Sequence, residues 1–143
     1  MPSPPDPRRQ ERAAWALAAL LVTTGVLHFV RPRLFESIVP GVLGSPRFWV
    51  AASGVAELGC AASLVVPRTR RAGGWACAVL FVAVFPANVQ MAAQSLRGEG
   101  SVLVAFSRLP LQVPLVLWAL YVAGALSSSG TRAGRRRRAS APG

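Results

Sequence analysis

The sequence predicts an all-α protein: a bundle of four transmembrane helices with a short interfacial helix between the first and second spans. Of its 143 residues, 52% are hydrophobic. They gather in four runs of about 18–25 residues that hold almost no charge, the length needed to cross a bilayer. The basic residues flank these runs. Apolar runs of this length exclude β-barrel strands, which alternate and are about half as long.

The four predicted spans follow one another along the chain. The first covers about 13–30 and contains no charge, and the second covers about 48–66 and contains one acid, Glu57. The third covers about 72–91, or reaches 96 if the run is counted up to Arg97, and the fourth covers about 109–126. A cleaved signal peptide fits the first run poorly, because no A-x-A-like site follows it.

The two ends read as tails around a single membrane domain, residues 12–126. Residues 1–11 begin with a stretch rich in Pro and Ser, and residues 127–143 consist of Ser, Gly, Arg and Ala with little else. Neither has apolar periodicity, so both are predicted to be disordered. We interpret the arginine run 135–138 as a topology anchor, with contact to anionic lipid headgroups as the alternative.

The arginines predict the orientation. All 16 basic residues are arginine. Four spans place both termini and the link between spans two and three on one side, with eleven arginines against five on the other. The positive-inside rule then predicts cytoplasmic termini in a bacterial plasma membrane. Topology also explains the net charge of +11 without a nucleic-acid partner. The eleven are Arg8, Arg9, Arg12, Arg68, Arg70, Arg71, Arg132, Arg135, Arg136, Arg137 and Arg138.

Polar residues enter the predicted spans at a similar depth, in the half of the bundle away from the termini. Polar groups in hydrocarbon are costly, so each needs a partner or a function. The acid of the second span, about nine residues in, lies near mid-bilayer and is the costliest of the set. We call the set the polar layer, and it comprises His28, Glu57, Asn88, Arg108 and Gln112.

Two prolines shape the spans that carry this layer. Pro86 predicts a kink in the third span, because it lacks an N–H and clashes with the carbonyl of residue 82. Pro110 suits the first turn of the fourth span. Arg108 and Gln112 are four residues apart, so they share a helix face.

Each member of the polar layer also has a purely structural interpretation. For Asn88 and Gln112 we favour hydrogen bonding between helices, and for His28 an ordinary interfacial histidine. For Glu57 we favour a functional role, with a structural Glu57–Arg108 ion pair as the main alternative.

The remaining chemistry is sparse. Cys60 and Cys77 form no C-x-x-C motif, and we expect them to be small packing residues. One histidine and two distant cysteines make no ligand cluster, so no metal site is expected. Catalytic-triad, P-loop and dinucleotide signatures are missing from the sequence. The link after the first span, residues 32–40, looks like a short interfacial helix whose apolar side chains would roof the polar layer.

Four sequence pieces together resemble a known family. They are His28-Phe29 with Pro32, Phe35 and Ile38-Val39-Pro40; Ser53-Gly54-Val55-Ala56-Glu57; Phe85-Pro86-Ala87-Asn88 with Met91; and Arg108-Leu109-Pro110-Leu111-Gln112. In this order, over residues 14–125, they resemble the DoxX family of small bacterial membrane proteins. The resemblance implies a four-helix membrane bundle and a connection with redox chemistry. Some relatives are subunits of a quinone-reducing thiosulfate oxidoreductase, and others are linked to oxidative-stress or thiol homeostasis.

The leading hypothesis is an accessory subunit of a quinone-linked redox or oxidative-stress system that binds a quinone or another small amphiphile in the polar layer. Glu57 would accept or relay a proton, while Asn88 and Gln112 would orient a carbonyl. The alternatives are a small-solute carrier acting as a dimer, or a structural partner of a larger membrane complex. The partners expected are the lipid bilayer and, for these alternatives, membrane proteins or a second copy. A non-catalytic role is favoured over an enzyme.

Overall fold

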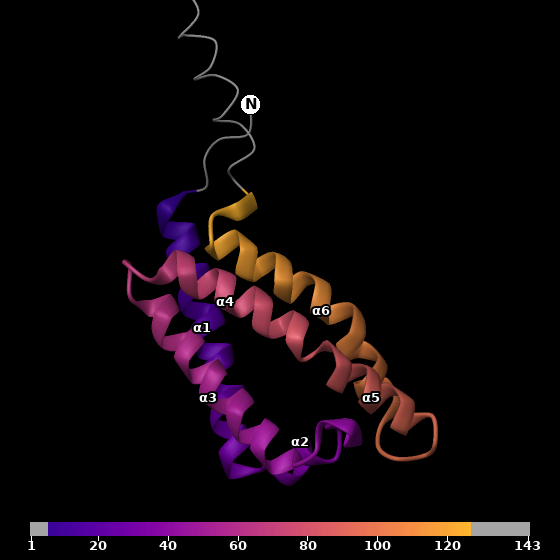
Figure 1. The fold of residues 1–143 in the computed structure, drawn as a ribbon. Coiled ribbons are helices and arrows are strands. Elements are labelled where there is room, and N and C mark those ends of the chain that lie inside the picture. Colours follow the sequence, from indigo (N-terminus) through magenta and orange to yellow (C-terminus); the bar gives the residue numbers. More distant parts are fainter. Residues whose placement is uncertain (1–5, 127–143) are drawn as a thin grey trace, which may run out of the picture.

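A computed structural model describes residues 6–126, and four of its helices are long and apolar enough to cross a membrane. The chain is therefore a multi-pass membrane protein, and the all-α prediction is confirmed. No strand occurs among residues 6–126. The spans are α1 (Pro7–Val30), α3 (Pro46–Val65), the pair α4 (Arg70–Ala83) and α5 (Phe85–Ser95), and α6 (Val102–Val122) (Figure 1).

Helix α1 begins before the predicted span. Asp6 caps it by accepting from the Arg8 backbone N–H at 3.0 Å, and Pro7 occupies its first turn. Residues 7–11 are therefore helical, although the sequence suggests a tail as far as residue 11. The rest of the two predicted tails, residues 1–5 and 127–143 with the arginine run, lies outside the described residues.

The link between the first two spans contains α2 (Arg33–Glu36) and the 3-10 turn η1 (Gly41–Leu43), which confirms the predicted short helix. It lies at the end of the bundle opposite the start of α1 and the end of α6 (Figure 1). We call these the α2 end and the terminal end. Ile38 of the link is buried, and the Gln94 side chain of α5 donates to the Ser37 carbonyl at 2.7 Å. The link thus joins the first two spans to the third.

The third span is broken, as Pro86 predicts. Helix α4 ends at Ala83, Val84 interrupts it, and α5 starts at Phe85 with Pro86 in its first turn. The fourth span departs from its prediction, because α6 starts at Val102 after the cap Ser101. The expectation that Pro110 opens this helix is wrong.

Pro110 and Pro114 both lie inside α6. The charge of Arg108 resembles a span boundary in the sequence, but this side chain is half-buried within the helix. The apolar residues before it extend the helix toward the α2 end.

The apolar core fills only the terminal half of the bundle. In that half α3 packs against α1 and α4, and α6 packs against α4. Toward the α2 end, α5 packs on α6 and has at most marginal contact with α1 or α3. The spans therefore separate into an α1–α3 pair and an α5–α6 pair (Figure 1). The core residues are Ala14, Leu17, Ala18, Leu21, Cys60, Ala61, Leu64, Cys77, Ala78, Phe81, Ala119 and Val122.

Candidate functional site

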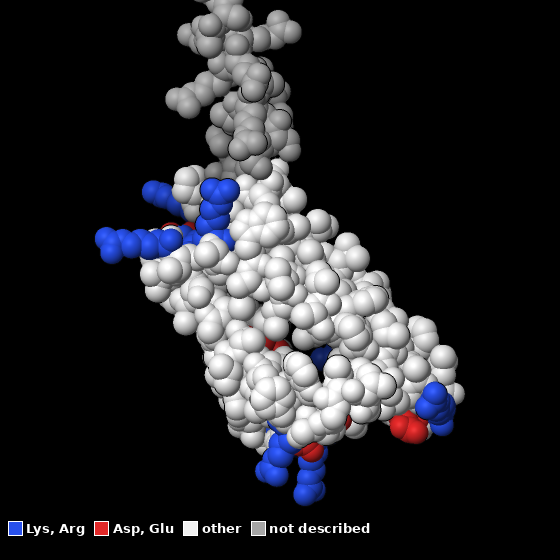
Figure 2. Space-filling view, in the orientation of Figure 1, with Lys and Arg blue, Asp and Glu red and all other residues white. Residues whose placement is uncertain are grey.

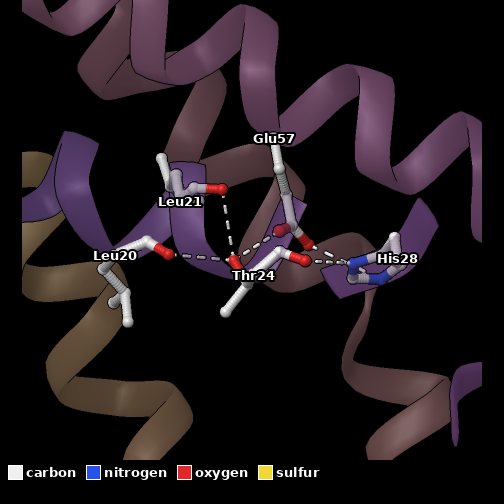
Figure 3. Close-up of polar contacts among 5 residues, drawn as sticks. All are labelled: Leu20, Leu21, Thr24, His28 and Glu57. Atoms are coloured by element: carbon white, nitrogen blue, oxygen red, sulfur yellow. Dashed lines mark hydrogen bonds and ion pairs between the residues drawn. The ribbon is translucent and has the colours of Figure 1, made fainter. Parts of the chain in front are cut away.

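Glu57 begins the polar layer just where the apolar core ends. It lies inside α3, about 16 Å along the helix from its start, and only 8% of it is exposed. Its carboxylate faces α1, where the Thr24 hydroxyl donates to Oε2 and the His28 Nε2 lies 3.8 Å from Oε1 (Figure 3). The acid thus points into the bundle toward polar groups of a neighbouring span.

Thr24 connects this carboxylate to the backbone of α1. Its hydroxyl oxygen lies 3.1 Å from the Leu20 carbonyl oxygen and 3.4 Å from that of Leu21, as well as beside Glu57 (Figure 3). A hydroxyl has one proton and two acceptor lone pairs. It can therefore donate to an ionised Glu57, or accept from a protonated Glu57 while donating to a carbonyl. Both protonation states of the acid have a partner here.

His28 is held in one tautomer. Its Nδ1 lies 2.7 Å from the Thr24 carbonyl oxygen, which can only accept, so Nδ1 carries a proton. The ring stacks on Phe35 of α2, with centroids 3.9 Å apart and planes 17° apart. In the neutral ring Nε2 is then a free acceptor directed at Glu57. The predicted roof is present, because Phe35 covers this histidine.

Asn88 and Gln112 lie together on the other helix pair. Asn88 Nδ2 donates to Gln112 Oε1 at 2.9 Å, and Gln112 Nε2 donates to the Phe81 carbonyl. The break at Val84 separates that carbonyl from its usual helical donor, the N–H of residue 85. The sequence points to the carbonyl of residue 82 as the one that Pro86 disturbs, whereas the structure shows a side-chain donor at the Phe81 carbonyl. The two amides therefore form hydrogen bonds at the break between α4 and α5 and satisfy a carbonyl that it leaves without its helical donor.

Arg108 shares the α6 face of Gln112 and lies one turn nearer the α2 end. Its Nη1 lies 3.5 Å from the Met91 sulfur, a weak acceptor. The structure contains no Glu57–Arg108 ion pair, although the guanidinium acts electrostatically on the carboxylate from farther away. The structural ion pair weighed as an alternative is therefore not formed. Within residues 6–126 the oppositely charged neighbours are Arg70 with Glu11 and, when the histidine is protonated, His28 with Glu57.

A hollow opens between the two helix pairs. Figure 2 shows it partway along the apolar face, with acidic and basic atoms at its floor. Away from the span ends, Glu57 and Arg108 are the charged residues of the described spans. The polar layer thus has two walls: His28 and Glu57 on α1 and α3, and Asn88, Arg108 and Gln112 on α5 and α6.

Sequence reasoning missed Thr24, the residue in closest contact with the acid. Its signal was available, because Thr24 and His28 are four residues apart and share one face of α1. Ser53, quoted in the second of the four sequence pieces, lies one turn before Glu57 on α3. Cys60 and Cys77 are free thiols buried in the core, in keeping with packing roles. The described residues contain no cluster of His, Cys, Asp and Glu that could hold a metal ion.

These features define a four-helix membrane protein with a buried acid in its second span and a break in its third. The chain belongs to the family described as a domain of unknown function (DUF8561), whose family model matches residues 17–123. This segment contains the whole polar layer. No curated protein and no solved structure matches the chain. The resemblance to the DoxX family stays a prediction.

Proposed function

We propose that the chain is a DoxX-like membrane protein that binds a quinone, or another small amphiphile with a polar head, in the hollow between its helix pairs. It would act as an accessory subunit of a membrane redox or oxidative-stress system. The observation that carries the proposal is the Glu57 carboxylate, held between Thr24 and His28 at mid-span. Buried acids within spans are costly and usually mark proton or substrate sites.

The partners of Glu57 suit proton exchange. The Thr24 hydroxyl can pair with the carboxyl group in either protonation state, by donating to the ionised form or by accepting from the protonated form. The free Nε2 of His28 provides an acceptor for a ligand hydroxyl or for the protonated acid. Reduction of a quinone to a quinol takes up two electrons and two protons. The electrons would come from the redox partner of this accessory subunit, and Glu57 would supply one of the protons.

The opposite wall would recognise a carbonyl. Arg108 has a charged fork of donors whose nearest partner is a thioether sulfur, so a ligand oxygen would be a better acceptor. The proposal revises the roles of Asn88 and Gln112, because Asn88 already donates to Gln112 and Gln112 already donates to the backbone. They would hold α6 in the position that presents Arg108.

The hollow lies on the side of the bundle, facing where acyl chains would surround the spans (Figure 2). A ligand with an apolar tail could enter from the bilayer without crossing water. The excess of arginines at the terminal end supports cytoplasmic termini in a bacterial plasma membrane. The polar layer would then lie in the half of the membrane away from the cytoplasm.

Native mass spectrometry of the gently solubilised protein, followed by titration with a short-chain benzoquinone, tests this function. We expect Glu57→Gln to weaken quinone binding about tenfold or more, because the amide cannot exchange a proton. Its side chain can still accept from Thr24, so the fold should persist. The control is Glu99→Gln, which changes an exposed acid of the α5–α6 turn. Equal quinone affinity in both variants would contradict the proposal.

The broken third span favours one second candidate, a small-solute carrier acting as a dimer. Carriers commonly bind substrates where a discontinuous helix meets the bilayer midplane, and the Val84 break lies at the level of the polar layer. Solute flux into proteoliposomes that is lost in Glu57→Gln, from a protein that retains no quinone, would support the carrier instead.

A further inference from the structure

A second candidate site lies at the terminal end, far from the polar layer. An open pocket of about 460 Å³ lies between the start of α1, the α3–α4 turn and the end of α6. It is lined by Gln10, Pro67, Arg70, Arg71, Val122, Ala123 and Gly124. Two arginines at the rim of an otherwise apolar and amide-lined pocket suggest an anionic ligand.

The charge of this pocket is positive. Arg70 is held in place, because its Nε donates to the Leu64 carbonyl at 3.0 Å. Its Nη2 lies 3.5 Å from a carboxylate oxygen of Glu11 and has no hydrogen-bond acceptor. Arg71 is exposed. Glu11 thus lies beside one of the two arginines, and further arginine side chains surround the terminal end (Figure 2).

An amide from α1 reduces the negative potential at the end of α6. The carboxyl end of a helix carries partial negative charge on its unpaired carbonyl groups. Gln10 Nε2 donates to the carbonyls of Tyr121 and Val122, each at 3.1 Å, and the Tyr121 carbonyl also accepts from the Gly124 N–H at 3.0 Å. Helix α4 meanwhile begins at this end, and the positive end of its dipole adds positive potential.

Tryptophans indicate where the membrane surface lies. Trp15 of α1 and Trp75 of α4 are both about half exposed in the terminal half. Trp118 of α6 donates to the Ala13 carbonyl at 3.1 Å, within the same layer. Tryptophan side chains concentrate at the membrane–water interface. The pocket, beyond this layer toward the terminal end, would therefore sit among the lipid headgroups.

We propose that this pocket binds the phosphate group of an anionic phospholipid from the surrounding membrane. The guanidinium forks of Arg70 and Arg71 match phosphate oxygens in charge and geometry. Basic pockets between spans on the cytoplasmic side bind anionic headgroups in this way. The exposed apolar faces of the adjoining spans would hold the acyl chains. This site is separate from the polar layer and does not depend on the function proposed for it.

Native mass spectrometry of the full chain, titrated with phosphatidylglycerol or phosphatidylcholine in mild detergent, tests the site. We expect one phosphatidylglycerol to bind in preference to phosphatidylcholine. Arg71→Gln should weaken it about tenfold, the loss expected for a charge-assisted contact. Arg70→Gln should do the same, but it also removes the Leu64 contact, so Arg71→Gln is the main variant. The matched control is Arg68→Gln, an exposed arginine of the same turn outside the pocket.

Three results would overturn the proposal. The first is equal affinity for the two lipids, and the second is an equal loss in the Arg68 and Arg71 variants, which would indicate nonspecific attraction. The third is displacement of the lipid by an equal concentration of inorganic phosphate, which would show that the pocket takes free phosphate. Unchanged binding of phosphatidylglycerol by Glu57→Gln would support the separation of the two sites.

Discussion

Asn88 Nδ2 lies 2.9 Å from Gln112 Oε1, and this contact joins the third and fourth spans at the point where the third is broken. Gln112 in turn donates a hydrogen bond to the Phe81 carbonyl. A carbonyl freed in hydrocarbon would cost several kcal/mol if it stayed unpaired. The pair therefore allows a proline-induced break to exist inside the bundle.

Gln112→Leu should destabilise the protein by about 1–3 kcal/mol, because it leaves the Phe81 carbonyl and the Asn88 amide without partners. Thermal unfolding in detergent, followed by circular dichroism, measures the effect. Gln90→Leu is the control, since this amide of the same broken span makes no hydrogen bond in the structure. Equal melting temperatures for the two variants would show that the bond from Gln112 to the Phe81 carbonyl does not stabilise the broken span.

Thr24 and Glu57 should be energetically coupled. Thr24→Val should cost about 1 kcal/mol in the wild type and much less in a Glu57→Leu background, where its partner is gone. Unfolding of the two single variants and the double variant completes the cycle. Thr23→Val is the control, because its hydroxyl is exposed and bonds only to the Ala19 carbonyl. A coupling energy no larger than that of Thr23 would contradict the contact.

Gly74→Ala should destabilise the terminal half by about 1–3 kcal/mol through overpacking. A Cβ there would lie 2.6 Å from the Ala123 nitrogen and 2.9 Å from the Ala119 carbonyl oxygen, which are backbone atoms. Gly59→Ala is the matched control, since its Cβ would meet nothing within 4 Å. That change should stabilise α3 slightly, by up to about 1 kcal/mol. Comparable melting temperatures would show that α4 and α6 can move apart.

The orientation can be tested with single cysteines, because the native thiols Cys60 and Cys77 are buried. In intact cells, a membrane-impermeant maleimide should label a Glu99→Cys variant. It should label an Arg68→Cys variant only after the membrane is permeabilised. Both positions are exposed links at opposite ends of the bundle. The reverse pattern would invert the proposed topology.

The spans were predictable because hydropathy records which residues avoid water, and that signal is strong over about 20 residues. The start of α6 was not, because a charge in the sequence looks the same at a membrane surface as inside a bundle. Arg108 lies inside, next to Met91. Only the packing of α5 on α6 distinguishes these two environments.

The candidate site was predictable in depth but not in its arrangement around the bundle. Counting residues along each span predicts the polar layer in the half away from the termini. It could not show that Glu57 faces Thr24 and His28 while the two amides face each other across another helix pair. Those neighbours depend on how each helix is rotated, which follows from packing rather than from sequence spacing.

In several polar contacts between spans and links, the acceptor is a backbone carbonyl. Substitution of the donor residue therefore breaks the contact, whereas substitution of the acceptor residue does not. Gln112 donates to Phe81, Gln94 to Ser37 and Trp118 to Ala13, in each case at the main-chain oxygen. Almost any residue at the accepting position offers the same atom, whereas the donor has few substitutes. Related sequences should therefore vary freely at residues 13 and 37 while keeping their donors, and paired substitutions would not reveal these contacts.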